Sequence, residues 1–332
     1  MRAFAARGLP LRRVRRGVCA GLAGALAAGA AAAVGPDIPP FGLGAFDRSE
    51  PISITADELE ARDNDGTRTL AFRRAVQVHQ GPLSLSADLL EAVYVSGESQ
   101  PRELEARGSV EIREGTRRAR CEQARYDRAA QKLVCRGGPA ELWDADDRLA
   151  GGVISFDLAR KSVRVEGGTE VELHRELSEA DLAELGADPE ALERVRGKGP
   201  LAVHAETLEA SDPADAERRI RFAGGVTLKQ GDIELRAREL EAIYPPGAAK
   251  PDRLIARDEV ALRQGERAAQ CQHAEYRLAE RQLSCHGAAV LRDGDDHLEG
   301  ERIAFDFGAQ KVDAVGRTKL FVQSLRRERG SE

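Results

Sequence analysis

The chain has 332 residues, of which 32% are charged and only 4% are aromatic, and its formal net charge is −6. A net-acidic chain lacks the basic face that sequence-independent nucleic-acid binding requires, so binding to nucleic acid is excluded as its function. The length suggests about two domains of ordinary size. The scarcity of aromatic residues predicts modest cores made of leucine, valine, isoleucine and alanine.

Residues 1–35 form a segment of their own. They contain six arginines and no acidic residue, and the arginines are followed by an apolar run rich in glycine and alanine. This order is typical of a secretory signal peptide, whereas a retained N-terminal anchor is the alternative interpretation. Residues 36–50 are rich in proline and glycine and are interpreted as a linker. The N-terminal segment therefore predicts an exported protein.

From residue 51 to residue 173 the chain consists of short segments in which apolar and polar residues alternate. Examples are residues 52–54, 83–87 and 110–112, and turn signals such as Asp65-Gly66 and Gly137-Gly138 separate such segments. Segments of about five residues with turns every 8–12 residues predict antiparallel β-structure with one buried face. Amphipathic helices of ordinary length are missing from this stretch, which disfavours a βαβ fold.

The chain contains an internal duplication. Six residues between positions 118 and 137 recur 150 residues further on, and two of them are cysteines. The similarity continues on both sides, so residues 201–323 are predicted to be a second copy of residues 51–173. The recurring residues are Cys121, Ala124, Tyr126, Leu133, Cys135 and Gly137, which match Cys271, Ala274, Tyr276, Leu283, Cys285 and Gly287.

A different pattern separates the two copies. In residues 174–200, Ser178 precedes an acidic turn, and Pro189 stands where the first residue of a second short helix is expected. A capping serine and a proline at the first helical position are helix-start signals. We therefore predict a short helical linker between the copies, and a polar tail at residues 324–332.

The four repeated cysteines flank the predicted hairpin turns at residues 127–132 and 277–282. Simple alternation would place Cys121 and Tyr126 on opposite faces of the sheet. The spacing Cys121, Ala124, Tyr126 instead indicates a bulge near Glu122-Gln123 that returns both to one face. An exported chain meets oxidising surroundings, in which disulfides form. The two interpretations are disulfides Cys121–Cys135 and Cys271–Cys285, or four buried and unpaired thiols.

The sequence shows no catalytic constellation. It has no serine nucleophile elbow, no phosphate-binding loop and no dinucleotide fingerprint, so we expect neither an enzyme nor a cofactor. The first copy has Gln123 and Arg136 where the second has histidines, which disfavours a zinc site and leads us to expect no metal. The residues with zinc-ligand chemistry in the second copy are Cys271, His273, Cys285 and His286.

The apolar pattern resembles a known family. The stretches Ile52-x-Ile54-x-Ala56, Leu83-x-Leu85-x-Ala87, Leu104-x-Ala106-x-Gly108 and Cys121-x-x-Ala124-x-Tyr126 follow one another in the first copy and have counterparts in the second. Their order and spacing resemble the OstA-like domain of the lipopolysaccharide transport proteins LptA, LptC and the periplasmic part of LptD. The resemblance implies an all-β fold of two tandem OstA-like β-jelly rolls, V-shaped and with an open apolar interior. The duplication, the cysteine pairs and the helical insertion depart from a single-domain LptA.

The function implied by this resemblance is that of a periplasmic bridge protein. It would carry lipopolysaccharide from the inner to the outer membrane through an apolar groove, for outer membrane assembly. The implied partners are the acyl chains of lipopolysaccharide and, by edge-strand pairing, the OstA-like domains of LptC-like and LptD-like proteins, or further copies of this chain end to end. Phosphates of the head group would stay outside, near Arg73, Arg74 or Arg113.

Two alternatives remain open at this point. The chain could be an LptC-like, membrane-anchored component of the lipopolysaccharide export transporter, or an envelope scaffold of β-repeats that carries no lipid. In the main interpretation the groove is lined by the inward apolar residues of both copies, whereas in a scaffold the same residues only fill a core. The predicted lining residues are Ile52, Ile54, Phe72, Val76, Val78, Leu83, Leu85, Tyr94, Ile112, Tyr126, Leu133, Phe156, Phe222, Val226, Leu228, Ile233, Leu235, Tyr244, Tyr276, Leu283 and Phe305.

Overall fold

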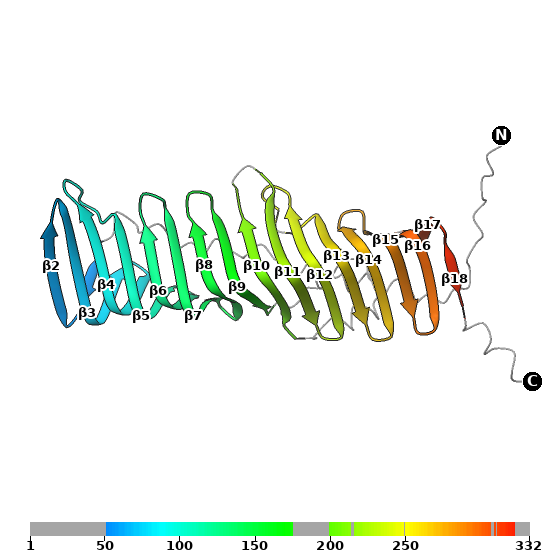
Figure 1. Cartoon of the computed structure of the whole chain (residues 1–332), viewed down its shortest axis with the longest axis horizontal. Coiled ribbons are helices and arrows are strands. Elements are labelled where there is room, and N and C mark those ends of the chain that lie inside the picture. The colour runs from blue at the N-terminus through cyan, green and yellow to red at the C-terminus, as the bar shows by residue number, and fades with distance from the viewer. Residues whose placement is uncertain are drawn as a thin grey trace, which may run out of the picture.

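The computed structural model describes residues 51–174, 199–213, 216–248, 250–306, 309 and 311–322. In these residues all regular structure is β, and eighteen strands form one antiparallel sheet. The strands lie across the long axis of an elongated molecule and follow the chain from one end to the other (Figure 1). The predicted signal peptide, the predicted helices of the linker and the polar tail lie outside the described residues.

Nine strands belong to each copy. Those of the first copy are β1 (Ser53–Thr55), β2 (Glu58–Asn64), β3 (Thr67–Gln80), β4 (Leu83–Val95), β5 (Glu103–Glu114), β6 (Arg117–Asp127), β7 (Lys132–Asp144), β8 (Asp147–Asp157) and β9 (Ser162–Leu173). Those of the second are β10 (Leu201–Ser211), β11 (Arg218–Gln230), β12 (Ile233–Tyr244), β13 (Arg253–Gln264), β14 (Arg267–Arg277), β15 (Gln282–Asp293), β16 (Asp296–Asp306), β17 (Lys311–Val315) and β18 (Lys319–Phe321).

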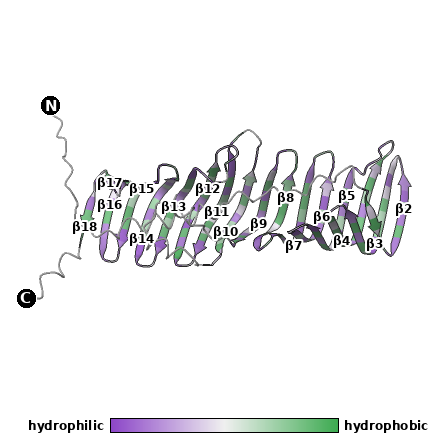
Figure 2. Cartoon of the chain, turned by 180° about the vertical axis from the view of Figure 1, so that it is seen from behind, coloured by the Kyte–Doolittle hydropathy of each residue, from purple (hydrophilic) through white to green (hydrophobic). Residues whose placement is uncertain are grey.

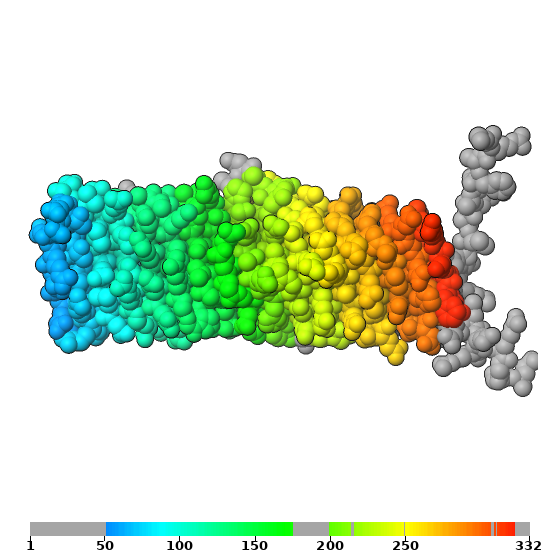
Figure 3. All heavy atoms as spheres, in the orientation of Figure 1, coloured from blue at the N-terminus to red at the C-terminus, as the bar shows by residue number. Residues whose placement is uncertain are grey.

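The predicted all-β tandem arrangement is confirmed, and the two copies also form one continuous sheet, which the prediction did not include. β9 pairs with β10 along its length, from Leu201 opposite Leu173 to Ser211 opposite Ser162. An unpaired strand edge exposes backbone hydrogen-bond donors and acceptors. Here the donors and acceptors of the last strand of the first copy are paired with those of the first strand of the second copy. The molecule accordingly has a single smooth body through the junction (Figure 3).

Most strands are longer than the five residues expected, because each crosses a β-bulge. The register shifts between Arg120 and Gln123 on β6, which confirms the predicted bulge at this place. The sequence predicts a turn at Gly137-Gly138, but these residues lie inside β7, whose register with β8 shifts between Arg136 and Ala140. Alternation breaks at a bulge, so one bent strand has the sequence pattern of two short ones.

The bulges lie side by side on successive strands and form a line along which the sheet bends, here called the fold line. Gly108 on β5 has φ +78, and a Cβ there would lie 2.2 Å from Asp88 Oδ2. Gly224 on β11 has φ +84 and would meet Glu206 Oε2 at 2.4 Å. Glycine adopts this backbone conformation without strain and leaves room for the neighbouring carboxylate, whereas Asp258 and Arg74 hold a positive φ at the equivalent positions of the other copy. The fold line divides the sheet into two limbs.

Candidate functional site: the apolar interior

Apolar side chains form rows that run along the molecule from strand to strand. Each member of a row lies directly opposite its neighbour on the next strand, so the rows cross the strands at right angles. The first apolar row, on one limb, contains Ile54, Val78, Leu85, Ile112, Ala119, Leu142, Leu149, Val171, Val203, Leu228, Leu235, Leu262, Ala269, Leu291, Leu298 and Leu320. Hydrophobic and hydrophilic residues follow one another along the strands (Figure 2), and successive side chains of a strand point to opposite faces.

The second apolar row lies on the other limb, across the fold line. It contains Leu59, Phe72, Leu90, Ala106, Ala124, Cys135, Ile154, Val165, Leu208, Phe222, Leu240, Ala256, Ala274, Cys285, Ile303 and Ala314. A hollow lined by Ile112 and Leu142 of the first row also touches Cys135 of the second. The two limbs therefore face each other, and their rows together form the interior.

The rows are not interrupted where the two copies meet. Val171 lies opposite Val203 in the first row, and Val165 lies opposite Leu208 in the second. All four side chains are buried and belong to one hydrophobic cluster that includes residues of both copies. The interior is therefore a single apolar layer from the first strands to the last.

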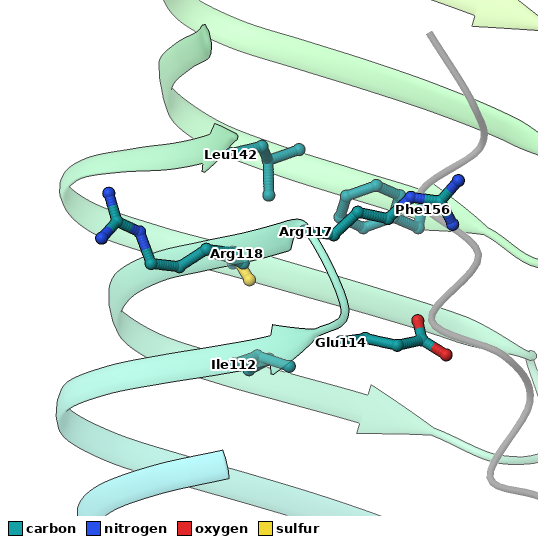
Figure 4. Close-up of a pocket in the computed structure, with 8 residues that line it drawn as sticks. Ile112, Glu114, Arg117, Arg118, Leu142 and Phe156 are labelled. Atoms are coloured by element: carbon teal, nitrogen blue, oxygen red, sulfur yellow. The ribbon is translucent and has the colours of Figure 1, made fainter. Parts of the chain in front are cut away.

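Side chains fill the interior, which differs from the open interior expected. The hollow beside Ile112, Leu142 and Phe156 has a volume of about 10 Å³, close to the space of one water molecule. Figure 4 shows Glu114 and Arg117 at its mouth beside Phe156, whereas Arg118 points the other way. Close packing of facing apolar side chains removes water and gains dispersion energy, so the limbs close on each other.

Most of the predicted lining residues lie in this interior. Ile52 does not, because its side chain is 53% exposed at the N-terminal end of the sheet. Tyr94 is only half-buried. The buried ones are Val76, Val78, Ile112, Leu133, Phe156, Phe222, Val226, Leu228, Ile233, Leu235, Tyr244, Tyr276, Leu283 and Phe305. Partly buried against the same cluster are Ile54, Phe72, Leu83, Leu85 and Tyr126.

Sequence reasoning missed several of the best-buried residues. Leu142, Ile154, Val165 and Leu208 are at most 1% exposed and stand in the two rows. A signal for two of them was present, because Ile154 and Leu142 recur as Ile303 and Leu291 in the second copy. Alternation alone does not reveal Leu142, since the bulge at Arg136–Ala140 breaks the pattern that begins at Leu133.

Both ends of the interior carry exposed apolar side chains. Leu59, in the second row on β2, is 61% exposed, and Leu320, in the first row on β18, is 64% exposed. Val315 and Phe321 are also exposed at the C-terminal end. Among the described residues, β2 pairs with β3 alone and β18 with β16 alone, so each has one unpaired edge. Exposed apolar side chains beside an unpaired edge are typical of a surface that pairs with another chain.

The cysteines of each copy lie together in the interior beside the fold line. Cys135 lies opposite Ala124, and Cys121 lies just across the bulge of β6. A hydrogen bond to Cys121 and burial raise the pKa of the Cys135 thiol well above its usual range. Cys271 and Cys285 repeat this arrangement, and all four thiols are buried and unpaired in the structure. The two thiols of each copy thus lie next to each other, and the disulfide between them stays a prediction.

We expect the exported protein to contain both disulfides, because each thiol already has its partner beside it. Its intact mass under non-reducing conditions should be lower than the reduced mass by four hydrogen atoms. Each closed loop should stabilise the fold by roughly 3 kcal/mol on the chain-entropy model, and Cys121→Ala with Cys135→Ala should remove that share for the first copy. Four thiols that react with an alkylating agent in the unfolded, unreduced protein would contradict this prediction.

The described residues offer little for other chemistry. No group of three or more histidine, cysteine, aspartate or glutamate residues within them is placed to hold a metal ion. His273 and His286 approach each other with ring centroids 6.1 Å apart, without a further ligand. In the same part of the chain, no helix is long and apolar enough to cross a membrane.

Comparisons with known proteins identify relatives of both copies. The family model described as LptA/(LptD N-terminal domain) LPS transport protein matches residues 53–162 and 202–311. The crystal structure of LptH, described as the LptA homologous periplasmic component of the lipopolysaccharide transport device from Pseudomonas aeruginosa, is similar at 20% identity and a TM-score of 0.31. That match covers 36% of this chain and 85% of LptH. No curated protein matches the chain significantly.

Proposed function

Because the chain belongs to the family of lipopolysaccharide transport proteins typified by LptA and the N-terminal domain of LptD, we propose that it is a periplasmic bridge that carries lipopolysaccharide from the inner to the outer membrane. Members of this family are transport proteins and not enzymes. The observation that carries the proposal is the continuity of the apolar rows, which extend through both copies and reach exposed apolar side chains at both ends.

The chemistry of the rows suits the acyl chains of a glycolipid. Each CH₂ group that leaves water for an apolar surrounding gains about 0.8 kcal/mol. Apolar contacts have no fixed direction, so an acyl chain can move along the rows without breaking specific hydrogen bonds. In this proposal the acyl chains enter between the two limbs, which move apart at the fold line, and the polar head group stays at the rim.

The exposed apolar ends support the remaining parts of this proposal. An elongated sheet with unpaired edges at β2 and β18 can be extended by the OstA-like domains of LptC-like and LptD-like proteins or by further copies of this chain. A position in the periplasm follows from the predicted signal peptide, and two copies in one chain make a longer segment of such a bridge. An LptC-like, anchored role would depend on residues 1–35, which lie outside the described residues.

The closed interior favours a second candidate function. A β-repeat scaffold that links envelope proteins without carrying lipid needs a filled core, and the hollow of about 10 Å³ is consistent with one. The two functions differ in whether lipid ever reaches the side chains of the rows. Lipid contact inside the sheet is therefore the measurement that separates them.

We expect a photoreactive amino acid at Leu85 or Leu235, both in the first apolar row, to crosslink to lipopolysaccharide in cells. The neighbouring positions Ser84 and Glu234 belong to the same strands and point to the outer face, so the same amino acid there should give little or no lipid adduct. The adducts are detected by gel shift and by immunoblotting for lipopolysaccharide. Labelling confined to protein at both Leu85 and Leu235 would favour the scaffold.

A further inference from the structure

The outer face of the first copy carries arginines packed around a tryptophan. Arg118 on β6 lies directly between Arg113 on β5 and Trp143 on β7. The guanidinium carbon of Arg118 is 4.2 Å from the centre of the Trp143 ring, and that of Arg120 is 5.6 Å away. Cations over the face of an indole ring hold it in place through the ring quadrupole. Trp143 is also the single tryptophan of the chain.

Positive charge exceeds negative charge at this place. Arg113, Arg120 and Arg118 share the carboxylate of Glu111, with nitrogen–oxygen distances of 2.9, 3.3 and 4.0 Å. Although burial alone would raise the pKa of Glu111, hydrogen bonds from Arg113 and Arg120 keep it below its ordinary value. One carboxylate cannot neutralise three guanidinium groups. In addition, the buried Nε of Arg118 has no hydrogen-bond partner among the described residues.

A shallow hollow of about 370 Å³ lies beside the arginines and is lined by Arg113, Thr116, Arg118 and Trp143 among others. This volume is in the range of sites for small molecules. Asp144 at its border is already engaged, since it accepts hydrogen bonds from Thr116 Oγ1 at 2.7 Å and Arg117 Nε at 3.3 Å. Arg113 and Arg118, which share one carboxylate with Arg120, and the exposed part of the Trp143 ring are therefore the groups of the hollow that a ligand can reach.

The hollow on the outer face lies next to the apolar interior. Arg117 and Arg118 line both this hollow and the small interior hollow of Figure 4, so only the turn between β5 and β6 separates them. A molecule with acyl chains between the limbs could thus place its polar part over this turn and onto the arginines. The turn between β5 and β6 thus has the apolar interior on one side and the arginines of the outer face on the other.

The second copy has the same fold without this arrangement. In place of Arg118, Arg120 and Trp143 it has Ala268, Gln270 and Arg292. Ala268 lies opposite Arg292 just as Arg118 lies opposite Trp143, so the strands are unchanged while the chemistry is different. The backbone therefore does not require the arginines and the tryptophan, and they are a feature of the first copy that the shared fold does not explain.

The geometry points to a binding site for a phosphorylated saccharide on the outer face of β5, β6 and β7. Guanidinium groups bind phosphate oxygens through paired, charge-assisted hydrogen bonds. The exposed part of the Trp143 ring offers a flat apolar surface for the face of a sugar ring. This inference deepens the proposed function, because the ligand is then either the head group of the glycolipid carried in the interior or a free sugar phosphate of the same chemistry.

Trp143 makes the test direct, because all tryptophan fluorescence of the protein comes from this site. Phosphorylated, deacylated lipopolysaccharide should change the fluorescence saturably, and the same saccharide after removal of its phosphates should bind at least about tenfold more weakly. Arg118→Ala with Arg120→Gln, which introduces the residues of the second copy, should weaken binding by a similar factor. The matched control Arg263→Ala with Arg292→Gln removes the same charge from the second copy and should bind like the unchanged protein.

Comparison with intact lipopolysaccharide identifies the source of the ligand. Tighter binding of the intact lipid assigns the site to a head group whose acyl chains are bound at the same time, whereas equal binding assigns it to a free saccharide. A phosphorylated saccharide that leaves the fluorescence unchanged, or binding that Arg118→Ala with Arg120→Gln does not weaken, would overturn the inference. Crosslinks at Leu85 and Leu235 together with unchanged Trp143 fluorescence would support lipid transport through the interior but not this binding site. A fluorescence change without lipid crosslinks at Leu85 and Leu235 would support the binding site but not the transport.

Discussion

Replacing Leu208 with aspartate is expected to destabilise the protein by about 4 kcal/mol or more. The side chain is fully buried between Val165 on β9 and Phe222 on β11, at the junction of the two copies. The substitution removes a buried leucine, which alone costs about 3–5 kcal/mol, and adds a carboxylate that has no partner among its apolar neighbours. The free energy of unfolding, measured by urea denaturation followed by circular dichroism, should fall by this amount.

His204→Asp is the matched control for this prediction. It places the same carboxylate on the same strand, β10, but on the exposed face opposite Glu170, so the free energy of unfolding should fall by no more than about 1 kcal/mol. If Leu208→Asp left the midpoint unchanged, the two copies would not share a packed interior at β9 and β10. The continuous apolar layer on which the proposed transport depends would then be wrong.

Placing glutamate at both Leu320 and Phe321 is expected to weaken end-to-end association of the protein by about 100-fold. Both side chains are exposed on β18, and burying one large apolar side chain contributes about 1.5–3 kcal/mol. Charges on an edge strand also oppose pairing with another strand. Sedimentation velocity over a series of protein concentrations gives the association constant, and about 3 kcal/mol corresponds to this factor.

Leu59→Glu should have a comparable effect, because in the proposed head-to-tail assembly the β2 end of one molecule meets the β18 end of the next. A mixture of the Leu59→Glu protein with the doubly substituted β18 protein retains one intact interface and should form dimers but no longer assemblies. Ser84→Glu with Ser86→Glu adds two charges away from both ends and serves as the control. If the association constant is unchanged in both the Leu59→Glu protein and the doubly substituted β18 protein, the molecules associate through another surface.

The sequence alone predicts the strands and their inward faces well, because both follow from local alternation and from the duplication. The bulge on β6 is one example, since the spacing of Cys121, Ala124 and Tyr126 indicates it and the register confirms it. Other bulges were less visible, because residues other than glycine, such as Arg74 and Asp258, hold the positive φ there. A bulge without glycine leaves little trace in a sequence.

The joining of the copies and the closure of the interior could not be predicted. Pairing of β9 with β10 links strands separated by residues 174–200, and nothing local to Leu173 or Leu201 distinguishes a paired edge from a free one. Whether the limbs close depends on the volumes of facing side chains such as Ile112 and Phe156. Trp143 escaped notice because a single outward aromatic residue has no pattern, and only its packing against Arg118 makes it informative.

The order of the strands has a consequence for how the chain folds. With few exceptions each strand pairs with the strands that precede and follow it in the sequence, so almost all contacts are made between nearby segments. Such low contact order is unusual for an all-β protein and favours fast folding. Folding can then begin at any hairpin and grow in both directions, as in repeat proteins. The pairing of β9 with β10 is the slow step to expect, since these two paired strands are separated by the longest stretch of sequence.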